Sequence, residues 1–253
     1  MFRRLFGAAF AAGIVAGLAI SAIQEFTTTP IILHAEEYEN AGTEAAIPEA
    51  TLPETAVFRV AGTGAFHGFT IYKAHSGEEH GDEAWGPEDG LERSLFTAGT
   101  NITMGIAFAL MLTAAFAVHG GAITGRIGLL WGIGGFAVFT LGPNLGLPPE
   151  VPGSMAAELG ARQLWWIGCA AATGIGLCLM VFGRKLPLTV LGVLILAAPH
   201  IVGAPQPAEI GGGVPPEIAG HFAAASIVVA AVFWVMLGWL SGTFYQRFSG
   251  ANA

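Results

Sequence analysis

Residues 96–118 read FTAGTNITMGIAFALMLTAAFAV, a continuous run without a charged side chain. A helix of about 20 apolar residues crosses the hydrocarbon core of a bilayer. Further apolar runs occupy residues 5–23, 127–141, 164–182, 188–202 and 221–240. The runs at 127–141 and 188–202 are short, at about 15 residues against the usual ~20. The sequence therefore predicts an all-α integral membrane protein with about six transmembrane helices.

Composition and charge support this class of protein. The chain is 53% hydrophobic and 11% charged, which is too apolar for an ordinary soluble domain, and its net charge of −8 does not favour nucleic acid as a partner. Most carboxylates lie between residues 25 and 92. We expect a single membrane domain over residues 1–253, with residues 24–92 forming a long extramembrane loop after the first span.

Lysine and arginine near the ends of the spans predict the orientation, because such residues favour the cytoplasmic side. One side of the predicted membrane domain holds Arg3, Arg4, Arg126, Arg184, Lys185 and Arg247. We therefore expect both termini in the cytoplasm, the loop 24–92 in the periplasm, and three helix hairpins joined on the outer side. Small residues four apart, at Gly13 and Gly17 and at Gly105 and Ala109, predict close helix packing.

Two segments repeat one pattern, an apolar run that meets a proline beside a polar residue and then a second proline pair with a glutamate. The first is LGPNLGLPPEVPG at residues 141–153, and the second is AAPHIVGAPQP at 197–207 followed by GGGVPPEIAG at 211–220. Paired, proline-interrupted apolar segments indicate a transporter binding site. Broken backbone at membrane depth is tolerated where it is buried in protein or lines a cavity.

Imidazole and carboxylate side chains gather near the outer ends of the predicted spans, a combination that suits divalent cations such as Co²⁺, Ni²⁺ and Zn²⁺. The candidate metal ligands are His34, Glu37, Asn144, Glu150, His200, Glu217 and His221. His75 and His80, in the acidic loop AHSGEEHGDEAW, are candidates for loose metal capture, although a solvated loop and polar helix ends are competing interpretations. No phosphate-binding loop, HExxH motif or nucleophile arrangement occurs, so we expect no enzyme activity and no firmly bound cofactor.

The two cysteines, Cys169 and Cys178, both lie in the predicted span 164–182. Nine residues of helix separate them by about 13 Å and about half a turn. They cannot bond to each other or hold one metal ion together, and the sequence indicates packing residues at both positions.

The chain resembles the CbtA family of predicted cobalt-transporter membrane subunits. The resemblance rests on HAEEYE, AWGPEDGLERSLFT, GPNLGLPPEVPGS, RQLWW and APHIVGAPQP, which extend from the first span to the last loop. It implies a bacterial inner-membrane protein tied to cobalt supply for cobalamin biosynthesis, with a small single-span CbtB-like partner subunit. A homo-oligomer is left open.

These observations predict a permease subunit that passes Co²⁺, or a similar transition metal, between helix hairpins by means of histidine, asparagine, glutamate and backbone carbonyl groups. One alternative is an accessory or assembly subunit that transports nothing. Another is a haem or metal protein of the membrane, in which His200 and His221 would be the axial ligands.

Overall fold

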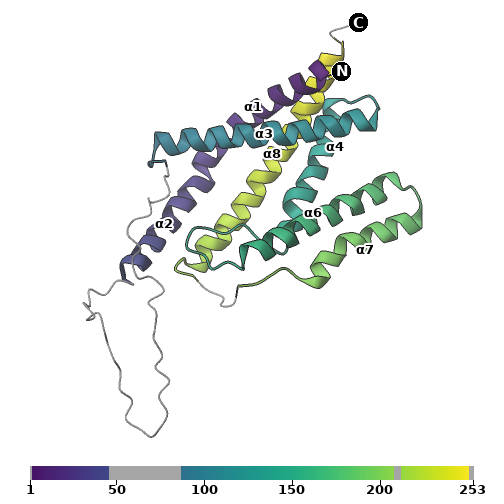
Figure 1. The fold of residues 1–253 in the computed structure, drawn as a ribbon. Helices are drawn as coiled ribbons and strands as arrows, with labels where there is room; N and C mark the ends of the chain where they lie inside the picture. The colour runs from purple at the N-terminus through teal and green to yellow at the C-terminus, as the bar shows by residue number, and fades with distance from the viewer. Residues whose placement is uncertain (1, 46–86, 208–211, 251–253) are drawn as a thin grey trace, which may run out of the picture.

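The computed structural model describes residues 2–45, 87–207 and 212–250, and the described elements are helical. They are α1 (Phe2–Phe26), α2 (Thr28–Ala45), α3 (Leu91–His119), α4 (Gly125–Phe136), a π-helical turn η1 (Ala137–Leu141), α5 (Gly142–Asn144), α6 (Leu159–Phe182), α7 (Leu186–Val202) and α8 (Pro216–Gly250) (Figure 1). Within these residues, five helices are long and apolar enough to cross a membrane, counting α4, η1 and α5 as one, and α7 is a shorter apolar helix. The expectation of a helical, multi-span membrane protein is confirmed at this level.

The core lies among α1, α3, α4 and α8. Its largest fully buried side chains include Phe116 and Leu237, and Trp234 is also buried there. Phe108 packs its ring 4.7 Å from that of Trp234, and Phe139 stacks on the same indole. These aromatic contacts join α3, the π-helical turn and α8, so they hold the end of α4 against the bundle.

Glycines allow the closest helix approaches. A Cβ atom built on Gly13 would lie 2.4 Å from the backbone nitrogen of Ile106, and one on Gly105 would lie 2.6 Å from the carbonyl oxygen of Gly13. The predicted close packing of small residues in the first two spans is therefore confirmed for α1 and α3. The same device joins α4 to α8, where a Cβ on Gly128 would lie 2.3 Å from the carbonyl oxygen of Gly238.

Helices α6 and α7 form an antiparallel pair that stands beside this bundle (Figure 1). Gly176 and Gly192 face each other across the pair, because a Cβ on either would lie within 2.7 Å of the other's carbonyl oxygen. The side chain of Glu158 accepts hydrogen bonds from the backbone N–H groups of Gly160 and Ala161, which caps α6 and lowers the pKa of this carboxyl. The pair meets the rest of the chain mainly through η1 and α5.

The predicted layout of three hairpins is not what the structure shows. Helix α3 packs on α1 as expected, but α4 packs mainly on α8 and α6 packs mainly on α7. The physical reason is the position of the glycines: Gly128 and Gly132 face α8, and Gly176 faces α7, so the closest approaches join helices from different predicted hairpins. The expected layout of three hairpins is thus not supported.

Part of the expected loop at 24–92 is also helical. Helix α2 begins one residue after α1, separated by a turn in which Thr27 donates its backbone N–H to the carbonyl oxygen of Gln24. α2 contacts α1 and α8. The candidate residues His75 and His80 lie outside the described residues.

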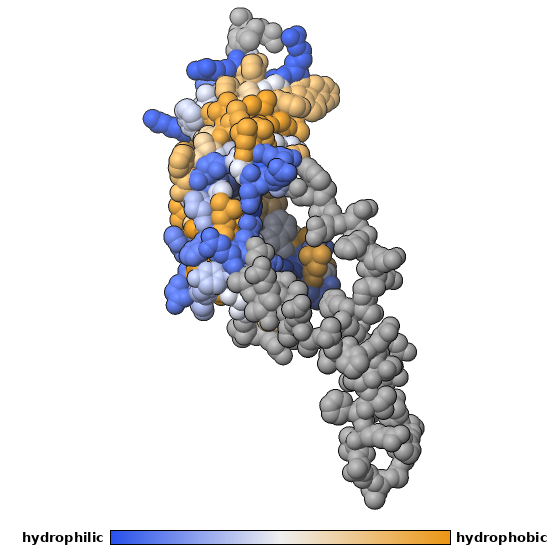
Figure 2. Space-filling model, turned by 90° about the vertical axis from the view of Figure 1, so that its left-hand side faces the viewer, coloured by the Kyte–Doolittle hydropathy of each residue, from blue (hydrophilic) through white to orange (hydrophobic). Residues whose placement is uncertain are grey.

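The two ends of the molecule differ in charge. Both termini lie at one end, the termini end, where Arg4 donates a hydrogen bond to the carbonyl oxygen of Tyr245 and Gly125 lies against Thr243 (Figure 1). No carboxylate occurs before residue 25 or after residue 217. At the opposite end, the α2 end, Arg93 and Arg162 form ion pairs with Glu36 and Glu150. Figure 2 shows apolar residues gathered between hydrophilic groups on one face.

Candidate site at the ends of the broken helices

Both proline-broken segments contact one tryptophan. Trp165, in the second turn of α6, donates its indole N–H to the carbonyl oxygen of Pro199 over 3.3 Å. On another side, Gly146 lies so near the indole ring that a Cβ would be 2.4 Å from it. Ala204 is also adjacent to Gly146. Trp165 therefore brings the segment after α5 and the end of α7 to one place.

Each break has a local cause in proline. Pro143 has no backbone N–H, and the turn before it widens into the π-helix η1, in which the N–H of Gly142 donates to the carbonyl oxygen of Ala137. π-helical turns inside α-helices are frequent at functional sites. Pro199 lies inside α7, and the helix ends three residues later at Val202. Proline frees carbonyl oxygens in both helices.

The segments that follow the breaks also meet each other and α2. Ser154 and Gly212 form an antiparallel bridge, which joins the first segment to the second. Gly153 lies against the side chains of Val214 and of Glu39 from α2, and Gly213 approaches the carbonyl oxygen of Tyr38. The segments that follow α5 and α7 are therefore in contact with each other and with α2 at the α2 end.

His200 is half-buried on the face of α7 that meets α6. Its Nε2 atom lies 3.8 Å from Sγ of Cys169, and its ring centre lies 5.9 Å from that of Trp165. Both neighbours come from α6, one turn apart. Cys169 has no exposed surface, so the sulfur and the imidazole face each other inside the helix pair.

Asn144 and Glu150 lie on the chain between η1 and α6. Asn144 is half-buried and is the last residue of α5. One carboxylate oxygen of Glu150 lies 2.7 Å from a guanidinium nitrogen of Arg162 in the first turn of α6. Glu150 is thus engaged in an ion pair, whereas its second oxygen has no bond to this arginine.

The α2 candidates are exposed. His34 packs its ring 5.5 Å from that of Tyr38, one turn further along the helix. Glu37 is exposed, while its neighbour Glu36 forms a two-pronged ion pair with Arg93 of α3, with one Nη1–Oε2 distance of 2.9 Å. The pair fixes α2 on the start of α3 and leaves the carboxylate of Glu37 toward solvent.

Glu217 and His221 lie one turn apart near the start of α8, and both are exposed. Over residues 2–45, 87–207 and 212–250, no three histidine, cysteine, aspartate or glutamate side chains come close enough to hold a metal ion. The candidate residues are instead distributed along the α2 end, over α2, the two connections and the first turns of α8.

A mainly apolar cavity with a few polar lining residues, between α1, α2, α3 and α8, was not foreseen from the sequence. It measures about 250 Å³, and its polar lining residues are Gln24, Thr28, Asn101 and Ser226. Asn101 donates hydrogen bonds to Oγ of Ser21 at 2.9 Å and to Oε1 of Gln24 at 2.6 Å. An asparagine inside an apolar run was the available signal, because polar side chains within membrane helices are costly to bury.

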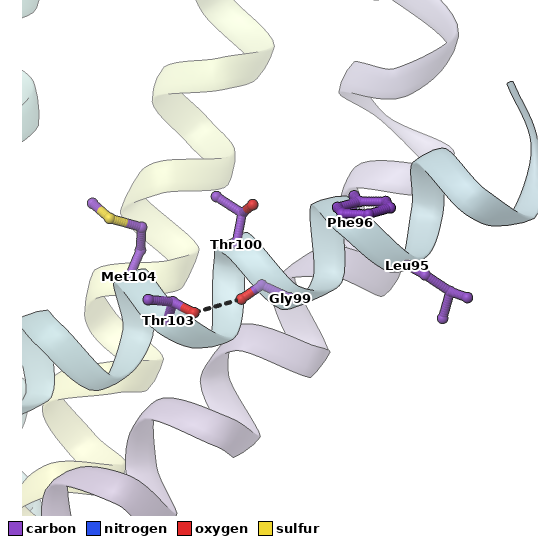
Figure 3. Close-up of a pocket in the computed structure, with 6 residues that line it drawn as sticks. All are labelled: Leu95, Phe96, Gly99, Thr100, Thr103 and Met104. Carbon is purple, nitrogen blue, oxygen red and sulfur yellow. Dashed lines mark hydrogen bonds between the residues drawn. The ribbon is translucent and has the colours of Figure 1, made fainter. Parts of the chain in front are cut away.

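A groove runs along the outer side of α3 beside this cavity. Leu95, Phe96, Gly99, Thr100, Thr103 and Met104 line it (Figure 3). Thr103 donates its hydroxyl to the carbonyl oxygen of Gly99 within the helix (Figure 3). The groove lacks ionisable side chains, so it offers a cation little beyond hydroxyl and carbonyl oxygens.

A comparison with models of known families finds one match. A family model described as "Probable cobalt transporter subunit (CbtA)" matches residues 2–246. No curated protein and no solved structure matches the chain.

Proposed function

Because the chain belongs to the CbtA family of probable cobalt transporter subunits, we propose that it is the membrane permease subunit that carries Co²⁺, or a similar divalent transition metal, into the cell. The observation that carries this proposal is the meeting of both proline-broken segments with Trp165 and with α2. A transporter subunit is not an enzyme class, which agrees with the absence of catalytic motifs from the sequence.

The proposed orientation places the termini end in the cytoplasm of a bacterial inner membrane and the α2 end in the periplasm. Its support is the charge difference between the ends. Arg3, Arg4, Arg126, Arg184, Lys185 and Arg247 belong to the termini end, in the outermost turns of α1, α4 and α8 and in the turn between α6 and α7. Such basic flanks favour the cytoplasmic side. Helix α2 and the residues between α2 and α3 would then lie on the periplasmic side.

In the proposed path, the cation first meets side chains at the exposed α2 end. His75 and His80 would capture it loosely from the loop. His34 and Glu37 of α2, and Glu217 and His221 of α8, are exposed and free to exchange with solvent ligands. Weak successive contacts suit conduction, because a site that binds too tightly prevents release.

The cation would next pass Asn144 and Glu150 toward His200, aided by carbonyl groups that Pro143 and Pro199 leave without helical donors. Asn144 and His200 are both half-buried. Glu150 would exchange its ion pair with Arg162 for the cation. Each of these steps replaces part of the water shell of the metal with protein nitrogen or oxygen.

The description of the family as a subunit implies a partner, and we propose a small single-span CbtB-like protein in the same bilayer. The outward faces of α6 and α7 support this, because they expose large apolar side chains such as Leu164 and Leu194 and have few neighbours in the chain. Association of two copies through the same faces is the competing arrangement.

Uptake of radiolabelled cobalt tests the proposed function. Cells that lack the chain are complemented with the wild type, His200→Ala or Asn144→Ala. The wild type should restore cobalt accumulation, and both variants should reduce it at least several-fold at equal protein levels in the membrane. Thr103→Ala is the control, because its side chain lies in the groove on α3. Unchanged uptake by both variants would remove this path.

A further inference from the structure

We propose that Cys169 and His200 together form a nitrogen–sulfur contact for the cation within the membrane, and that this contact distinguishes transition metals from Mg²⁺ and Ca²⁺. The inference rests on the proposed function but assigns a residue to the path that the sequence pattern treated as packing. Its starting point is the 3.8 Å separation between Sγ of Cys169 and Nε2 of His200.

This separation fits two ligands of one metal ion. A thiolate sulfur binds Zn²⁺-like ions at about 2.3 Å and an imidazole nitrogen at about 2.0–2.1 Å, so at a tetrahedral angle the two atoms lie about 3.6 Å apart. The atoms of Cys169 and His200 are therefore near ligand spacing without a change of helix position. Both ligands come from facing helices, so neither depends on a loop.

A third polar group lies beside the pair. The hydroxyl of Thr173, one turn after Cys169 on α6, is next to the Cys169 thiol. Thr173 is 3% exposed, and its hydroxyl neighbours the Cys169 thiol, which is only a weak hydrogen-bonding group. It also faces Gly142, where a Cβ would lie 2.8 Å from the hydroxyl oxygen, so the oxygen points toward the end of η1. A buried hydroxyl with only a thiol beside it is poorly satisfied, and a bound cation or its water would offer it a stronger partner.

The pair lies deep in the span. Cys169 is about 15 Å along α6 from its first residue, Leu159, at ~1.5 Å per residue. The last turn of the short helix α7, which contains His200, lies beside Cys169 and therefore at the same depth. Carboxylates occupy the α2 end but not this depth, since α6 and α7 carry none.

The change of ligand chemistry along the path gives the contact its role. Carboxylates and carbonyl oxygens at the α2 end suit Mg²⁺ and Ca²⁺ as well as transition metals. Imidazole and thiolate favour transition metals, in the order Mn²⁺ < Fe²⁺ < Co²⁺ < Ni²⁺, and bind Mg²⁺ and Ca²⁺ poorly. Two strong ligands do not complete a tetrahedral set, so the ion can leave. As the metal–sulfur bond forms and the S–H bond breaks, the thiol proton passes to a water molecule that leaves the hydration shell of the cation.

Titration of the full chain, purified in detergent, with CoCl₂ tests the site. A cobalt–thiolate bond gives a charge-transfer absorption band in the near ultraviolet that nitrogen and oxygen ligands do not give. The wild type should show this band at stoichiometric cobalt. Cys169→Ser should lose it, and His200→Gln should raise the cobalt concentration for half-saturation at least tenfold. Cys178→Ser is the matched control, because Cys178 is an exposed cysteine of the same helix.

Melting temperatures of the variants separate loss of the site from loss of the fold. A folded Cys169→Ser protein that keeps the band, or a wild type without the band, overturns the inference. Cobalt uptake separates it from the proposed function. One outcome is that cells with Cys169→Ser accumulate cobalt normally and reject Mg²⁺ as the wild type does. That result would agree with the proposed transport function and contradict the proposed nitrogen–sulfur contact. If the wild type shows the band but cells accumulate no cobalt, the site stands and the transport proposal falls.

Discussion

The indole N–H of Trp165 lies 3.3 Å from the carbonyl oxygen of Pro199, so α6 is tied to α7 at the residue that interrupts α7. The same ring packs on Gly146, just after the other interrupted helix. One side chain therefore fixes the two breaks relative to each other. Among the described helices α7 contacts mainly α6, so the position of His200 depends on how this pair is held together.

Trp165→Phe should weaken this tie. The substitution removes the N–H donor and keeps an aromatic ring, so we expect a loss of about 0.5–1.5 kcal/mol in the free energy of unfolding, the usual net value of one hydrogen bond. Thermal unfolding in detergent measures it. Trp166→Phe is the control, since Trp166 packs on Phe139 by its ring, and an equal loss in both variants would contradict the role of the N–H group.

Gly132→Ala should separate α4 from α8. A Cβ at this position would lie 2.3 Å from the carbonyl oxygen of Trp234, and backbone cannot move aside cheaply. We expect destabilisation of about 1–3 kcal/mol, typical of overpacking. Gly134→Ala, in the same helix, has open space around the new methyl group. It should leave the melting temperature nearly unchanged. A large decrease for Gly134→Ala would contradict the packing of α4 on α8 through Gly132.

Asn101→Ala should loosen α1 from α3 near the cavity between α1, α2, α3 and α8. The amide of Asn101 donates hydrogen bonds to Ser21 and to Gln24, and both bonds join α3 to α1. Side-chain hydrogen bonds between membrane helices contribute about 0.6 kcal/mol on average, and up to about 1.7. We expect a loss within that range. Thr103→Ala removes a bond inside α3 alone and should cost less; the reverse ranking would argue against the α1–α3 network.

Glu36 and Glu37 are adjacent but should have separable roles. Glu36→Gln weakens the ion pair with Arg93. The free energy needed to open α2 should therefore fall by about 0.2–1 kcal/mol, the usual contribution of a partly exposed pair. Hydrogen exchange of α2 measures this change. Glu37→Gln should leave exchange unchanged and lower cobalt uptake, because Glu37 is exposed and is a proposed ligand. Faster exchange in Glu37→Gln alone would reverse these assignments.

The sequence predicted the spanning helices well because uncharged runs of sufficient length have one stable state in a bilayer. It also predicted the glycine contact between α1 and α3, since small residues four apart form a smooth helix face. Partner choice among the remaining helices was not predictable in this way. Gly128 and Gly176 are small residues of the same kind, and which helix each one meets depends on the three-dimensional arrangement.

The site was predictable in part. Proline positions indicated both breaks, and their contact with each other agrees with the repeated pattern. The neighbours of His200 were missed, because Cys169 is distant in sequence and resembles an ordinary packing residue of an apolar helix. Helix α2 was missed because Pro30 and the carboxylates after it are typical of a loop, yet proline is tolerated in the first turn of a helix.

A transition-metal ion should bind where the broken helices meet. Anomalous diffraction at the cobalt absorption edge, from crystals of the full chain grown with CoCl₂, locates the ion directly. We expect an anomalous peak at bonding distance from Nε2 of His200, on the side of α7 that faces α6. Cobalt bound only at surface positions away from His200, or no bound cobalt, would contradict it.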